Sequence, residues 1–261
     1  MSVAMALAAL GPQVSAIVIT DAGTTYSEDF DSLASGGSTG SALPARWSFS
    51  ETGTNANATY GVGTGSSTTG NTYSYGSSES TDRALGGLRT GTLVPMFGVE
   101  LTNATGGLLN ALEVSFAGEQ WRLGTLGRTD RLDFQFSSDA TSLVTGTWSD
   151  LDSLDFISPT STGSVGLLDG NAAANRTALA ASILGLAWAD GASLWLRWSD
   201  FDATGSDDGL AIDDFSFVAR SPAAPPTQSV PDSLPMAAAF GIVLAGLAAV
   251  RRGLPEFERA A

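Results

Sequence analysis

The chain contains no cysteine, no histidine and no lysine. Without cysteine it has no disulfide and no thiolate nucleophile, and without histidine it has no Ser–His–Asp triad and no His-ligated metal. Its 27 acidic residues outnumber its 12 basic ones, so the formal net charge is −15. A surface this acidic repels phosphate backbones, and the sequence therefore predicts no nucleic-acid partner.

Basic residues are also missing from the N-terminal segment, which otherwise has the organisation of a signal peptide. Val3 to Leu10 form a short apolar core, and Val14-Ser15-Ala16 supplies the small residues that signal peptidase requires at its −3 and −1 positions. The apolar run is too short to span a bilayer. We therefore predict that residues 1–16 are a signal peptide and that the exported chain begins near Ile17. The alternative is a buried N-terminal helix.

The C-terminal segment has a Pro-rich part, an apolar part and a basic part. Residues 220–229 contain SPAAPPTQ, which is expected to form an extended linker. Met236 to Val250 is uncharged and rich in Ala, Gly, Leu and Val, and Arg251 and Arg252 follow directly. A helix over residues 234–250 spans about 25 Å, which is marginal for a bilayer core. The Arg pair obeys the positive-inside rule, so we expect the extreme C-terminus to be cytoplasmic.

This three-part order, over residues 230–261, resembles the bacterial PEP-CTERM class of sorting signals, in particular its VPDSG variant. The matching residues are Val230, Pro231, Asp232 and Ser233, with Leu234 in place of the glycine. The resemblance implies an exosortase-type membrane enzyme as partner, which cleaves near the motif, so that the apolar helix is a temporary membrane anchor. It also implies a Gram-negative-type envelope. We therefore expect an exported protein at the cell surface or outside the cell, with this motif, Arg251 and Arg252 as its sorting residues.

Residues 17–219 have the pattern of one all-β domain. Apolar and polar residues alternate as in half-buried strands, and turn residues separate the alternating segments. The apolar sets are Leu112, Val114 and Phe116; Leu132, Phe134 and Phe136; Leu194, Leu196 and Trp198; and Ile212, Phe215 and Phe217. Many short strands without a long amphipathic helix predict a jelly-roll-like antiparallel β-sandwich. Residues 172–184 form either a short helix or a strand, and residues 50–80 either a surface loop or thin polar strands.

The two ends of this domain resemble MAM and related concanavalin-like jelly rolls, and also uncharacterised domains found upstream of PEP-CTERM tails. Residues 28–33, EDFDSL, match a Phe-acid opening strand, and residues 209–217, GLAIDDFSF, match an Ile-Asp-Asp-aromatic closing strand. The resemblance implies that the first and last strands pair side by side and that Asp31 lies close to Asp213. The disulfides of animal MAM domains are missing, so their adhesion role is not carried over.

Acidic residues gather near the end of the domain, at Asp200, Asp202, Asp207, Asp208, Asp213 and Asp214. Calcium prefers several oxygen ligands, commonly carboxylates. We predict a calcium site in which Asp31 and Asp213 are ligands together with Asp200 or Asp202; calcium is the one cofactor that the sequence indicates. EF-hand spacing is absent. The alternative is a set of solvated acids that cap turns.

No catalytic residue is predicted. Glu113 and Glu119 share strand parity, but the Glu-x-Asp-x-x-Glu signature of jelly-roll glycosidases is missing, and Glu119 is expected to pair with Arg122 or Arg131. Two function classes remain. The first is a structural or interaction protein of the envelope or matrix, and the second is a module that binds polysaccharide. The candidates for stacking on sugars are Trp121, Trp148, Trp188 and Trp195. An exposed row of tryptophans favours the second class, and buried tryptophans favour the first.

Overall fold

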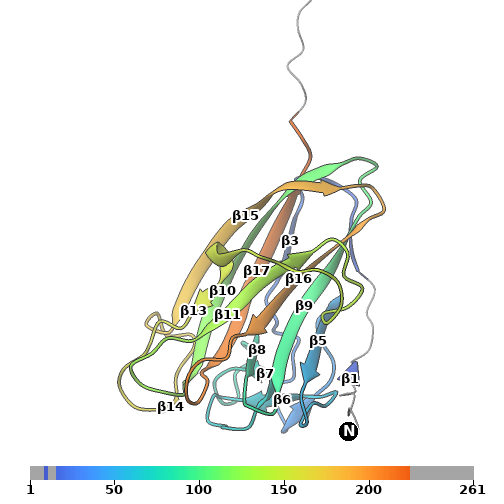
Figure 1. Ribbon diagram of the computed structural model, residues 1–261. Coiled ribbons are helices and arrows are strands. Elements are labelled where there is room, and N and C mark those ends of the chain that lie inside the picture. Colours follow the sequence, from blue (N-terminus) through green and yellow to red (C-terminus); the bar gives the residue numbers. More distant parts are fainter. Residues whose placement is uncertain (1–8, 11–15, 224–261) are drawn as a thin grey trace, which may run out of the picture. The chain divides into compact units, whose positions relative to one another are not determined.

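The computed structural model describes residues 9–10 and 16–223, and it shows two β-sheets packed face to face (Figure 1). The described residues include no α-helix, and only one helical turn of the 3-10 type, η1 (Asp152–Leu154). The predicted all-β sandwich is therefore confirmed. None of the described residues belongs to a helix that could cross a membrane. The sorting motif, the Arg pair, the predicted helix over 234–250 and most of the predicted signal peptide lie outside the described residues.

The first sheet has a path of six strands with two more at its sides. The path is β1 (Ala9–Leu10), β5 (Trp47–Thr52), β9 (Val94–Asn103), β16 (Ser193–Asp200), β11 (Arg131–Ser137) and β12 (Ser149–Asp150). In addition, β2 (Ile17–Ile19) pairs with β9 and β13 (Phe156–Ile157) pairs with β11. All of these pairs are antiparallel except β2 with β9, which is parallel.

The second sheet has a path of seven strands. They are β14 (Gly166–Leu167), β10 (Leu109–Leu123), β17 (Gly209–Arg220), β8 (Ala84–Leu88), β7 (Asn71–Tyr75), β6 (Tyr60–Gly63) and β4 (Thr39–Gly40). Two further strands flank the path, because β15 (Arg176–Trp188) pairs with β10 and β3 (Thr25–Glu28) pairs with β17. The pairing of β3 with β17 confirms the prediction that the opening and closing strands lie side by side.

The core lies between the sheets and is rich in aromatic side chains. Apolar residues predicted from period-two alternation are buried in it, including Leu112, Val114 and Leu196. Trp198 of the first sheet is at its centre and is fully buried. Its ring centroid lies 5.3 Å from that of Phe116 and 5.6 Å from that of Phe215, both on the second sheet. Contacts of this kind join the two sheets, because aromatic side chains bury a large apolar area each.

The two segments whose structure the sequence left open both contain strands. The segment 172–184 contributes to β15, which extends the second sheet beyond β10. The segment 50–80 contains β6 and β7, and its residues Tyr60, Tyr73 and Tyr75 are buried. Glycine makes this burial possible, because a Cβ atom at Gly61 would lie 2.5 Å from the Tyr73 ring.

Candidate functional site

The four acids predicted to bind calcium do not form one site. Asp200 ends β16 of the first sheet, whereas Asp213 lies on β17 of the second sheet, opposite Ala117. Asp31 is exposed beyond β3, and its Oδ1 accepts a hydrogen bond of 3.1 Å from the backbone N–H of Arg83. Asp202 is exposed and lies 3.3 Å from the Arg89 guanidinium. Within the described part of the chain, no three acidic residues are grouped so that they could hold a metal ion.

The predicted convergence of these acids is therefore corrected, and calcium binding itself stays a prediction. The physical reason is that strand alternation does not determine which sheet a strand joins, and Asp200 and Asp213 belong to strands of opposite sheets. Each of the two acids has instead its own buried polar neighbourhood.

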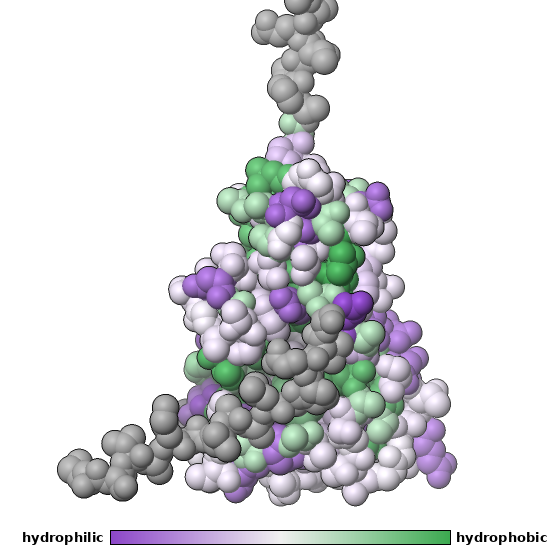
Figure 2. Space-filling model, turned by 90° about the vertical axis from the view of Figure 1, so that its right-hand side faces the viewer, coloured by the Kyte–Doolittle hydropathy of each residue, from purple (hydrophilic) through white to green (hydrophobic). Residues whose placement is uncertain are grey.

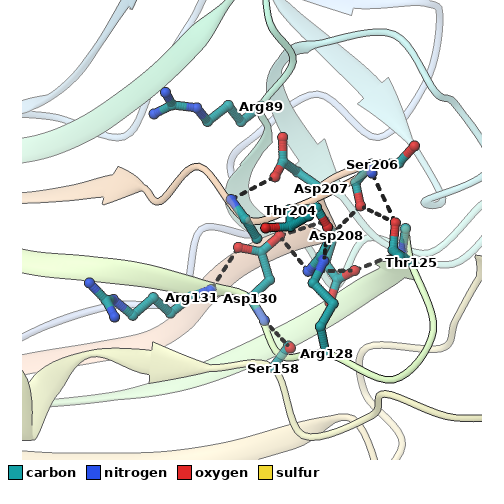
Figure 3. Close-up of polar contacts among 12 residues, drawn as sticks. Arg89, Thr125, Arg128, Asp130, Arg131, Ser158, Thr204, Ser206, Asp207 and Asp208 are labelled. Carbon is teal, nitrogen blue, oxygen red and sulfur yellow. Dashed lines mark hydrogen bonds and ion pairs between the residues drawn. The ribbon is translucent and has the colours of Figure 1, made fainter.

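The first neighbourhood, which we call the loop-end network, consists of Arg128, Asp130, Asp207 and Asp208, which are labelled in Figure 3, together with Asp200. All four carboxylic acids are buried. They come from the loop between β10 and β11, from the end of β16 and from the loop before β17. Sequence analysis identified the three acids near β17 but missed Asp130 and Arg128, because nothing in the spacing indicates that the two loops meet.

Asp208 is the best-satisfied member of this network. Its Oδ1 accepts a 2.7 Å hydrogen bond from the Gly124 N–H, and its Oδ2 accepts a 2.9 Å bond from Gln120 Nε2. Its own N–H donates to Asp130 Oδ2 at 2.8 Å. The Arg128 guanidinium lies 3.2 Å from the Asp130 carboxylate and 3.7 Å from that of Asp208. Figure 3 shows its side chain beside both acids. These contacts tie the two loops together, because a buried charge needs such partners.

Asp200 and Asp207 are less well compensated. Asp200 Oδ2 accepts a 3.0 Å hydrogen bond from the Arg89 N–H, and its Oδ1 has no hydrogen-bond partner among the described residues. Burial, and then the charges of Asp130 and Asp207, raise the pKa of Asp200 well above its ordinary value. Burial and the charge of Asp130 raise the pKa of Asp207 to about 6. Asp200 is therefore harder to ionise than an exposed aspartate, since desolvation penalises its charged form.

A cleft of about 370 Å³ lies beside the loop-end network. Four charged residues line it, namely Arg89, Arg122, Asp202 and Asp207, together with hydroxyl groups of Thr68, Thr90 and Ser206. No aromatic residue is among its lining residues. The cleft can therefore hold a polar ligand through hydrogen bonds, but it offers no ring on which a sugar could stack.

The second neighbourhood, which we call the mid-sheet cluster, consists of Glu119, Trp121, Arg176, Asp213 and Asp214. Glu119 is 1% exposed, and its Oε2 accepts a 3.0 Å hydrogen bond from Trp121 Nε1. Arg176 lies 3.4 Å from Glu119 Oε1, 3.5 Å from Asp213 Oδ2 and also contacts Asp214. Burial raises the pKa of Glu119 to about 7, and burial together with the charge of Glu119 raises that of Asp213 to about 8.

This geometry corrects the predicted partner of Glu119. Arg176 on β15 is its ion-pair partner, whereas Arg122 donates to the Gly65 carbonyl and Arg131 pairs with Asp133. Glu113 is not brought together with Glu119, since it is exposed in an ion pair with Arg220 at the other end of the same strand. The two glutamates share strand parity and lie on one strand, β10, but they are six residues apart along it.

Five of the six tryptophans are buried: Trp47, Trp121, Trp188, Trp195 and Trp198. The sixth, Trp148, is half-buried, and the Arg197 guanidinium lies 3.9 Å from its ring centroid. Three of the four candidates for sugar stacking are therefore in the interior, and no row of exposed tryptophans is present among the described residues. By the criterion set out from the sequence, this favours an interaction protein over a tryptophan-based sugar-binding module.

Short side chains cover the outer face of the second sheet where β3, β17, β10 and β15 lie side by side. Ser27, Ser216, Ser115 and Ala180 are in register across these four strands. The hydroxyl oxygens of Ser115 and Ser216 are 2.8 Å apart. A shallow groove of about 390 Å³ follows this face.

Comparison with known proteins assigns no family. No protein-family model matches the chain, and no curated protein matches it. One similar solved structure is the enzymatically active domain of tailspike protein 4 of bacteriophage CBA120, with 12% identity and a TM-score of 0.35 over 67% of this chain. The chain spans only 19% of that structure. Another is TmCBM61 in complex with β-1,4-galactotriose, with 13% identity, a TM-score of 0.31 and coverage of 55% of this chain and 74% of that one.

Proposed function

We propose that this chain is an exported, non-catalytic protein of the cell envelope or extracellular matrix, and that its β-sandwich contacts another macromolecule. The observation that carries the proposal is the distribution of side chains between interior and surface. Five of the six tryptophans and the strongly perturbed acids Glu119, Asp200 and Asp213 are inside, whereas the second sheet presents short side chains and an exposed edge strand. Such a surface suits contact with another chain better than capture of a small substrate.

The state of the buried carboxylates supports a non-catalytic role. A glycosidase needs two carboxyl groups that face the scissile bond from opposite sides, and a general acid has to reach the proton that it transfers. Glu119 and Asp213 have perturbed pKa values, but they are only 1% and 4% exposed. The indole of Trp121 donates to Glu119 Oε2, and the guanidinium of Arg176 forms ion pairs with Glu119 Oε1 and Asp213 Oδ2. Buried ion-pair networks of this kind also perturb pKa values in proteins without any activity.

Export and sorting are supported by the sequence at the two ends of the chain. The test is the pair of substitutions Arg251→Glu and Arg252→Glu in the full chain, expressed in a bacterium that has an exosortase-type enzyme. We expect unprocessed precursor to accumulate, because the basic cluster orients the apolar segment. Arg259→Glu, which changes a charge outside the Arg pair, is the control and should mature normally. Normal maturation of the double variant would refute the sorting proposal. Sequencing of the mature N-terminus should give a start near Ile17.

Polysaccharide binding is the second candidate function, and the cleft beside the loop-end network favours it. Two arginines, two aspartates and three hydroxyl groups converge there, a donor and acceptor set that suits sugar hydroxyls. Electrophoresis of the protein through gels that contain single polysaccharides tests this. The Asp202 side chain lines the cleft and is 70% exposed, so Asp202→Ala should lose the retardation by a polysaccharide that binds there. Asp21 does not line the cleft, so Asp21→Ala should keep the retardation. Equal mobility in all gels would reject this candidate.

A further inference from the structure

The strand β15 is an exposed edge of the second sheet, on the left of the sandwich in Figure 1. Its residues Arg176 to Leu184 pair with Glu119 to Ala111 of β10 in unbroken register. Within the described residues, no backbone hydrogen bond joins these nine residues to any element other than β10. Every second residue of such a strand points its N–H and C=O groups away from the sheet, where another strand can bind them.

The protection that edge strands usually have is missing from this part of β15. Proteins block exposed edges with lysine, proline, bulges or inward-pointing charges. Residues 176–184 read RTALAASIL, and their one charged residue, Arg176, is engaged by Glu119 and Asp214. The irregularity in pairing comes only after Leu184, at Gly185 with a φ of 71° and beyond.

The charge of β15 also differs from that of the rest of the chain. It is the only described strand longer than five residues that contains neither Asp nor Glu. In a chain with a formal net charge of −15, most surfaces of two copies repel each other. Along this edge the strand itself would present no acid to a second copy.

Apolar side chains are exposed along the same edge. Leu184 on β15 is 75% exposed. The edge continues into β14, which pairs with the far end of β10, and there Leu167 is 53% exposed and the preceding Val165 is 51% exposed. On the side of the sandwich that Figure 2 presents, turned away from β15, apolar residues lie in small groups among polar ones. Exposed apolar residues that line an open edge mark a pairing surface.

We propose that two copies of the protein associate edge to edge, with β15 of each copy antiparallel to β15 of the other, so that one sheet runs through both. The proposal rests on the proposed interaction role and names its partner. A two-fold axis at Ala180 brings the whole unbroken segment into overlap. Ala180 then lies opposite its own counterpart, Ala178 opposite Ser182, and Arg176 opposite Leu184. The exposed side chains of Ala178, Ala180 and Ser182 are short, so they leave room for the second copy.

The absence of cysteine from the chain makes a direct test possible. In the full chain, purified in detergent, Ala180→Cys should give a disulfide-linked dimer on mild oxidation. Residues directly opposite each other in an antiparallel pair have Cα atoms about 4.5–5.5 Å apart, within the range of a disulfide. The double variant Ala178→Cys with Ser182→Cys should also cross-link, whereas Ser182→Cys alone should not.

The control for nonspecific association is Ser149→Cys on β12, an exposed position at the edge of the first sheet. Cross-linking of Ala180→Cys no faster than that of Ser149→Cys would overturn the proposal. Adding Ala180→Lys to the double variant with Ala178→Cys and Ser182→Cys should reduce cross-linking to the level of Ser149→Cys. The melting temperature should not change, because Ala180 is exposed. If the chain is exported and processed normally but Ala180→Cys does not cross-link, the dimer is refuted, whereas the proposed function still stands.

Discussion

Replacing Glu119 with glutamine removes a buried charge from the mid-sheet cluster, and it should change how the stability of the domain depends on pH. Burial raises the pKa of Glu119 from 4.5 to about 7 in the folded protein. Folding therefore favours the protonated acid. The contribution of this group to stability is fully present below pH 4.5 and is lost as the pH rises through about 7.

The size of the effect follows from the same shift. One pKa unit corresponds to about 1.4 kcal/mol, so ionisation of Glu119 lowers the free energy of unfolding by about 3 kcal/mol between acidic and mildly alkaline pH. Asp213 adds to this, because its pKa of about 8 is raised by burial and then by the charge of Glu119. Glutamine keeps an oxygen that can accept the hydrogen bond from Trp121, but it carries no charge. The variant should therefore be more stable than the wild type above pH 8 by a margin that disappears near pH 5.

Thermal unfolding followed by circular dichroism at about pH 5 and about pH 8.5 measures this difference. For a domain of this size, about 3 kcal/mol corresponds to about 6–12 °C in melting temperature. Glu113→Gln is the matched control, because Glu113 lies on the same strand but is exposed in its ion pair with Arg220. It should leave the pH dependence unchanged. If Glu119→Gln and the wild type lose the same stability between the two pH values, the account of Glu119 as a buried, desolvated acid is wrong.

Three further predictions concern the interior and the acids. Asp208→Asn should cost about 2–3 kcal/mol in urea unfolding, because the amide of asparagine replaces a carboxylate oxygen that accepts from Gly124 or Gln120. Asp200→Asn should cost less, because Asp200 accepts a single hydrogen bond and burial disfavours its charged form. Gly118→Ala should lower the free energy of unfolding by about 2 kcal/mol, since the new Cβ would lie 2.1 Å from the buried Phe156 ring; Gly107→Ala, with nothing within 4 Å, should be neutral within about 0.5 kcal/mol. Comparison of calcium and sodium chloride at matched ionic strength tests the calcium prediction: a calcium-specific rise in melting temperature that Asp200→Asn removes would show that an ion enters the loop-end network, and equal shifts would agree with the lack of a grouped set of three acids among the described residues.

The strands and the core were predictable from the sequence because the alternation of side chains along a strand is a local property. Leu112, Phe134 and Trp198 are buried where period two places them. The pairing of the opening and closing strands followed from the resemblance of residues 28–33 and 209–217 to known jelly rolls. In contrast, the Ala-rich sequence of β15 has no clear period, and only its pairing with β10 makes it a strand.

The polar clusters could not be predicted, because they depend on which loops and strands meet in space. Asp200 and Asp213 are close in sequence but lie in opposite sheets, so each joins acids that are distant in the chain: Asp130 in one case and Glu119 in the other. The basic partners, Arg128 and Arg176, come from a loop and from an edge strand. A signal for the loop-end network was present in the run Asp207-Asp208, but its counter-charge lies about 80 residues earlier in the chain.

The scarcity of basic residues connects these interior clusters with the exposed edge. All twelve basic residues are arginines, and nine of them lie in the described part of the chain. Each of the nine contacts an oxygen: Arg46, Arg83, Arg89, Arg122, Arg128, Arg131, Arg176, Arg197 and Arg220. Five of them pair with carboxylates, and moving one such as Arg128 to the edge would leave the buried carboxylate of Asp130 without its counter-charge, which is costly in the interior. An acid would shield the edge at no such cost, yet β15 is the long strand that lacks one. The shortage of cations therefore does not explain why the edge of β15 is unprotected. This supports the proposal that the edge binds a second copy.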